Sequence, residues 1–96
     1  MSEELTVEEI NQHFSAMDDS VNLINDTIAD DTDALEMFGS AESVKEMMKR
    51  NTDHLELQLD KDWAIADNRD KSSYTDAITV GVNYINGLEK WKLKTT

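Results

Sequence analysis

The sequence predicts an all-α protein, with residues 1–96 forming a single domain built as a small bundle of about three helices. The chain has no proline and only three glycines, which suits helices joined by short turns. Apolar residues recur at helical spacing along most of its length. Residues that favour helix N-termini stand at Thr6 and Ser40, just before two of these periodic segments.

The first helix, long and acidic, is expected at residues 6–29. Thr6 and Glu9 have the spacing of a capping box, in which each side chain accepts the other residue's backbone N–H. The apolar residues that follow keep steps of three and four over three heptads, which favours long, nearly parallel packing in a bundle or coiled coil. This apolar seam consists of Val7, Ile10, Phe14, Met17, Val21, Ile24 and Ile28.

Four polar residues, 30–33, interrupt the apolar pattern, and we expect a short turn or helical extension that ends at Gly39. A second helix is expected at residues 40–62, with Ser40 as its N-cap. Asn51 falls inside its apolar stripe, where a polar residue often sets helix register. The stripe consists of Val44, Met47, Met48, Leu55 and Leu59.

The third helix is expected at residues 73–87, after a polar loop. A C-terminal hairpin over residues 78–94 is the alternative, because apolar residues alternate there and Asn86-Gly87 is a strong two-residue turn signal. The helical interpretation is preferred since the rest of the chain is helical. Gly81 would then cost about 1 kcal/mol relative to alanine. Such a glycine indicates a close approach to a neighbouring helix.

Charge divides the chain into two halves. Residues 1–44 contain twelve Asp and Glu and no Lys or Arg, whereas residues 45–96 contain nine acidic and nine basic residues. The formal net charge of −12 therefore lies entirely in the first half. Binding to nucleic acids or anionic lipids needs clustered basic residues, so this composition argues against direct nucleic-acid binding and against a membrane surface.

The residues that carry chemistry do not form a recognisable motif. The chain has no cysteine and two histidines, His13 and His54, which stand outside any metal-ligand pair. The acidic run 30–33 lacks the spacing of a calcium-binding loop. It is interpreted as a solvated turn, with weak cation binding as the alternative. No nucleophile–base arrangement or phosphate-binding loop occurs. We expect no enzymatic activity and no cofactor.

Part of the second half resembles a known group of proteins. The segment from Lys49 to Leu59 reads Lys-Arg-Asn-Thr-Asp-His-Leu-Glu-Leu-Gln-Leu, and Asp62-Trp63, Arg69-Asp70 and 74–79 follow it. This pattern resembles small conserved proteins of tailed bacteriophages. The resemblance implies a phage origin, and it carries no functional residues to this chain.

These observations predict a non-enzymatic phage protein, a virion structural or accessory component that acts through protein–protein contacts. The alternative is an acidic DNA mimic that inhibits a host nucleic-acid-binding protein. The acidic start argues against a signal peptide, and the absence of long apolar runs argues against a membrane-spanning segment. The virion or the host cytoplasm is therefore the expected location.

The last expectation concerns assembly. Lys90, Lys92 and Lys94 form the one dense basic patch, and they flank Trp91. We expect the protein to self-associate or to dock on a larger virion protein, with these lysines against the acidic surface of the first helix, either in the same chain or in a neighbouring one. The candidate interaction residues are Ile10, Phe14, Met17, Val21, Ile24, Ile28, Asp19, Asp26, Asp30, Lys90, Trp91, Lys92 and Lys94.

Overall fold

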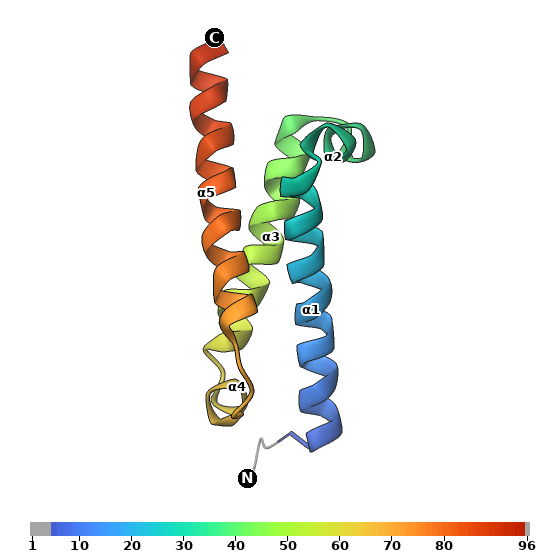
Figure 1. Ribbon diagram of the computed structural model, residues 1–96, viewed down its shortest axis with the longest axis vertical. Helices are drawn as coiled ribbons and strands as arrows, with labels where there is room; N and C mark the ends of the chain where they lie inside the picture. The colour runs from blue at the N-terminus through green and yellow to red at the C-terminus, as the bar shows by residue number, and fades with distance from the viewer. Residues whose placement is uncertain (1–4, 96) are drawn as a thin grey trace.

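The computed structural model confirms the all-α class (Figure 1). It describes the backbone of residues 5–95 and the side chains of residues 5–88. This part of the chain contains five helices and no strand. Three are long, in agreement with the predicted bundle, and two short ones were not predicted as separate helices. The helices are α1 Val7–Ala29, α2 Asp31–Phe38, α3 Ala41–Leu59, α4 Asp62–Ala66 and α5 Ser72–Thr95.

The three long helices lie side by side along the long axis of the molecule (Figure 1). α1 and α5 run in one direction and α3 returns in the other, so that α3 is antiparallel to both neighbours. The short helix α2 crosses one end of the bundle, and α4 lies at the opposite end. The molecule measures 53 × 24 × 21 Å as a result. The two short helices thus form its two ends.

The predicted boundaries of α1, α2 and the start of α3 are confirmed by their capping contacts. Thr6 and Glu9 form the capping box, with both side chain–backbone hydrogen bonds present. Asp30 ends α1 and also caps α2, because its Oδ1 accepts the backbone N–H of Asp33 at 3.0 Å. Gly39 ends α2 in a left-handed conformation, with φ 90°, that favours glycine. Ser40 then caps α3.

The second predicted helix is divided in the structure. α3 ends at Leu59, and a turn at Asp60 and Lys61 separates it from α4, so the predicted continuation to residue 62 is wrong. The turn lets α4 place Trp63 against His13 and Phe14 in the first half of α1. Asn51 does not bond across helices, because its amide donates to the carbonyl of Met47 within α3.

The hairpin alternative for residues 78–94 is wrong, and so is the predicted stop near residue 87. α5 begins at Ser72 and continues through Asn86 and Gly87 to Thr95. As a continuous helix it brings Ile78, Ile85 and Leu88 against the core. A turn at Asn86 would interrupt this helical stripe, so packing outweighs the local turn preference.

The core lies between α1, α3 and α5. The middle of the α1 seam faces inward, with Phe14, Met17 and Ile24 at 0–1% exposure, whereas Val7 at its start is 76% exposed. α3 adds Met48 and Leu55, which are equally buried. The close approach expected at Gly81 is confirmed, because that glycine is buried against Thr52 and Ile24. The interior therefore consists of the heptad pattern of α1 packed against the other two long helices.

Candidate protein-interaction site

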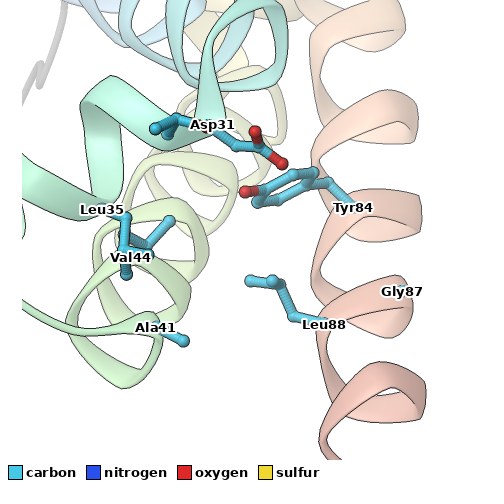
Figure 2. Close-up of a pocket in the computed structure, with 8 residues that line it drawn as sticks. Asp31, Leu35, Ala41, Val44, Tyr84, Gly87 and Leu88 are labelled. Carbon is cyan, nitrogen blue, oxygen red and sulfur yellow. The ribbon is translucent and has the colours of Figure 1, made fainter.

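A groove opens at the α2 end of the bundle, between α2, the start of α3 and the second half of α5 (Figure 2). Its volume is about 470 Å³. The residues that line it come from segments that are far apart in the sequence. They are Asp31, Thr32, Leu35, Ala41, Val44, Tyr84, Gly87 and Leu88. The groove thus exists only when the three helices are assembled.

The walls of the groove are mainly apolar. Val44 is buried at its base, Leu88 is half-buried and Leu35 is 45% exposed. Figure 2 shows Leu35 and Val44 on one side and Leu88 across from them on α5. Exposed apolar surface that converges in a concave site favours binding of an apolar group from another molecule.

Two polar groups stand together at one end of this groove. Figure 2 shows the carboxylate of Asp31 beside the hydroxyl end of Tyr84. Burial raises the pKa of Tyr84, and the negative charge of Asp31 raises it further. The phenol therefore stays protonated at neutral pH and can donate a hydrogen bond. A carboxylate next to an aromatic ring is a favourable environment for a basic side chain.

Small residues and short connections keep the groove open. Asp30 and Gly39 limit α2 to eight residues, so it crosses the bundle end instead of extending α1. Ala41 contributes one methyl group to the lining, and Gly87 contributes no side chain. A Cβ at position 87 would have no atom within 4 Å. The space beside α5 is thus unfilled by its neighbours.

The acidic residues proposed for the interaction surface are accessible. Asp19, Asp26 and Asp30 are all exposed, as are Asp31 and Asp33 at the start of α2. Asp31 connects this acidic surface to the groove, because it lines the groove itself. The groove therefore combines an apolar interior with an acidic edge.

Most of the seam residues that were predicted to contact a partner are not on the surface of the protein. Phe14, Met17, Val21 and Ile24 are buried within this chain, so they hold its own bundle together. Their assignment as contact residues for a partner is corrected on this point. Among the predicted seam contacts, Ile10 is half-buried and Ile28 is 38% exposed. Ile28 belongs to the last turn of α1, next to α2.

The basic patch falls partly outside what the structure describes. The backbone of this patch belongs to α5, but its side chains are outside the described part of the structure. The residues concerned are Lys90, Trp91, Lys92 and Lys94. Their predicted contact with acidic residues stays a prediction.

A second cluster closes the opposite end of the bundle. The Arg69 guanidinium lies 3.9 Å from the ring centre of Phe14 and donates to Asn11 at 2.8 Å. Arg69 also forms an ion pair with Asp67, at 2.7 Å between Nε and Oδ1. The Tyr74 hydroxyl donates to Asp18 at 2.6 Å. These contacts hold the α4–α5 loop and the first turn of α5 on α1, which is a structural role.

The two histidines also have structural neighbours. His13 stacks on Trp63, with ring centres 4.9 Å apart. His54 Nδ1 lies 3.1 Å from the hydroxyl oxygen of Ser20, which joins α3 to α1. Within residues 5–88, no three His, Asp or Glu side chains are grouped to hold a metal ion. No helix in the described part of the chain has the length and hydropathy needed to cross a membrane.

The sequence pattern does not predict the groove. Leu35, Met37 and Phe38 form a small apolar group before Gly39 in the sequence, and Leu35 is a groove residue. The rest of the lining comes from the start of α3 and from a part of α5 near the suspected turn. The groove forms only because α2 crosses the end of the bundle.

Comparisons with protein-family models, with curated proteins and with solved structures find no match to this chain.

Proposed function

We propose that this chain is a non-enzymatic phage protein, a virion structural or accessory component that works through protein–protein contacts. The observation that carries the proposal is the apolar groove between α2, α3 and α5 with Asp31 at its edge. The phage setting rests on the resemblance of the second half to small proteins of tailed bacteriophages. The partner surface rests on the geometry of the groove.

The groove favours a particular kind of partner segment. Leu35, Val44 and Leu88 suit an apolar side chain, because burial of a large apolar side chain stabilises a complex by roughly 1.5–3 kcal/mol. Asp31 and the Tyr84 hydroxyl suit a basic or hydrogen-bonding group beside that anchor. A basic amphipathic helix presents both features at i, i+3 and i+4 positions. We therefore expect the partner to supply such a helix.

Mass spectrometry of purified phage particles tests the virion part of this proposal. We expect the wild-type chain in particles at a fixed ratio to the major virion proteins. Leu35→Asp in the groove should reduce its incorporation. Leu57→Asp is the matched control, because Leu57 is a 62% exposed leucine on α3 that does not line the groove. Absence of the wild-type chain from particles would refute the virion role.

A second candidate function is inhibition of a host nucleic-acid-binding protein by an acidic DNA mimic. One observation favours it: Asp19, Asp26, Asp30, Asp31 and Asp33 are all exposed on α1 and α2. A pull-down from host lysate at low salt tests this function, and a DNA-binding protein released by added DNA is its expected result. Recovery of no DNA-binding protein would count against mimicry.

A further inference from the structure

The groove has a polar end and an apolar end, and two of its walls repeat this order at the same spacing. On α2 Asp31 is followed four residues later by Leu35, and on α5 Tyr84 is followed four residues later by Leu88. Residues four apart are neighbours on one helix face, with about 5–6 Å between their Cβ atoms. Figure 2 accordingly shows Asp31 beside Tyr84, and Leu35 with Val44 across from Leu88. A helix lying along the groove meets both ends with side chains four residues apart.

The polar end carries a negative charge that has no counter-ion among the side chains of residues 5–88. In this range the Asp31 carboxylate and the Tyr84 hydroxyl form no hydrogen bond or ion pair with another side chain. The two groups are close enough that the charge of Asp31 acts on the phenol. Residues 1–44, which include α1 and α2, contain no Lys or Arg. The polar end is therefore complementary to a cation from another molecule.

The opposite end of the bundle shows how this chain binds a cation with a ring and a carboxylate. There the Arg69 guanidinium lies 3.9 Å from the ring centre of Phe14, and its Nε lies 2.7 Å from Oδ1 of Asp67. One guanidinium is thus shared between an aromatic ring of a long helix and a carboxylate. In the groove, Tyr84 and Asp31 supply a ring and a carboxylate in the same way. A guanidinium is the group that fits between them.

Arginine suits these two groups better than lysine does. Its planar guanidinium can stack on an aromatic face while its N–H groups pair with a carboxylate, and it is less strongly hydrated than an ammonium group. A second copy of this chain does not supply it. The sequence has two arginines: Arg69 is already paired with Asp67, and the residues four positions from Arg50 are Glu46 and His54, which are not apolar. Two copies with a formal charge of −12 each also repel one another.

We infer that the groove binds a helix of another protein that carries an arginine and a large apolar residue four positions apart, which rests on the proposed function of the groove as a contact site. The guanidinium stacks on the Tyr84 ring and pairs with Asp31. The apolar residue enters between Leu35, Val44 and Leu88. The groove volume of about 470 Å³ is within the range of roughly 300–1,000 Å³ that is typical of ligand sites. It receives these two side chains while the rest of the partner helix stays outside.

Titration of the full chain with synthetic helical peptides tests the inference. The probe is a labelled helix of alanine and glutamine with one arginine and one leucine four positions apart, and fluorescence anisotropy measures its binding. We expect a dissociation constant in the high micromolar range. Replacing the arginine by lysine should raise that constant about fivefold or more, because lysine loses the stacked, bidentate contact. Moving the leucine by two positions places it on the far side of the peptide helix and should abolish binding.

Matched variants of the protein locate the contact. Asp31→Asn should raise the dissociation constant about tenfold or more, because it removes the charge that pairs with the guanidinium. Asp33→Asn is the control, since Asp33 is an exposed acid in the same turn of α2 that does not line the groove. It should change the constant by less than about twofold. Tyr84→Leu should weaken binding, whereas Tyr84→Phe, which keeps the ring, should not. Circular dichroism checks that each variant retains its helices.

Equal binding of the arginine and lysine peptides would overturn the inference, as would equal effects of Asp31→Asn and Asp33→Asn. Absence of binding by the wild-type chain at millimolar peptide concentration would do the same. If Leu35→Asp nevertheless reduces incorporation into phage particles, the groove is a contact site and its arginine preference alone is wrong. If the peptides bind as expected but particles lack the chain, the arginine site stands and the virion role fails.

Discussion

Gly81 brings α5 so close to α3 that a Cβ atom at position 81 would lie 2.5 Å from Cγ2 of Thr52. Ile24 of α1 is also near, at 3.5 Å from the same Cβ position. The three long helices thus meet at a position where α5 has no side chain. This close contact fixes the position of α5, whose following turns form one wall of the groove.

Gly81→Ala should destabilise the protein although alanine is the better helix former. The propensity gain is about 1 kcal/mol, but overpacking against Thr52 costs typically 1–3 kcal/mol. Gly87→Ala should instead stabilise by up to about 1 kcal/mol, since nothing lies within 4 Å of its Cβ position. Urea unfolding measures both. Thr52→Ser should rescue Gly81→Ala, because serine lacks Cγ2 and keeps the hydroxyl that donates to Lys49.

Ile24→Asp should unfold the protein, whereas Ile28→Asp should not. Ile24 is 0% exposed, and a buried unpaired carboxylate costs several kcal/mol, on the order of 4 or more. Ile28 is one helical turn further along the same seam but is partly exposed, so about 1 kcal/mol is expected there. Circular dichroism with urea titration distinguishes the two variants. Equal losses for both would contradict the assignment of Ile24 to the core.

Tyr74 should make part of the stability sensitive to alkaline pH. Burial, followed by its hydrogen bond to Asp18, raises the pKa of Tyr74 to about 12. A raised pKa in the folded state means that this stabilisation is complete below pH 10 and is lost as the pH rises toward 12. Tyr74→Phe should lose about 1 kcal/mol at pH 7. The gap in unfolding free energy between the two proteins should narrow above pH 10.

Asp67 should contribute acid sensitivity at the same end of the bundle as Tyr74. Its hydrogen bonds with the Arg69 side chain and backbone N–H hold the pKa of Asp67 below the ordinary value of 3.8. Its stabilising contribution is therefore present above that value and is lost as the pH falls through the lower folded-state pKa. Wild-type protein should unfold at higher urea concentration than Asp67→Asn at pH 7. The difference should shrink below pH 4, and a constant difference would argue against this contact.

The sequence predicted those parts of the fold that depend on local contacts. Thr6, Ser40 and Gly39 cap or end helices where expected, because caps are decided by residues within one turn. The α1 seam was also predicted, since a heptad repeat needs only one helix to be recognised. The division of α3 from α4 was missed, because packing of Trp63 on α1 decides it.

The groove could not be predicted for the same physical reason. It depends on α2 crossing the bundle after Asp30 and on α5 continuing through Gly87, where the local signal favours a turn. The seam residues were assigned to a partner because a single helix does not reveal which molecule covers it. In the structure α3 and α5 of the same chain cover that seam.

Site-specific photo-crosslinking most directly tests the claim that this groove is the contact surface. Benzoylphenylalanine replaces Leu35 in the groove or, as control, Leu57, the exposed leucine outside it. The chain is irradiated in phage-producing cells, and adducts are identified by mass spectrometry. We predict discrete adducts from position 35 with a virion protein, and none from position 57. Adducts only from position 57, or equal and nonspecific adducts from both, would contradict the account.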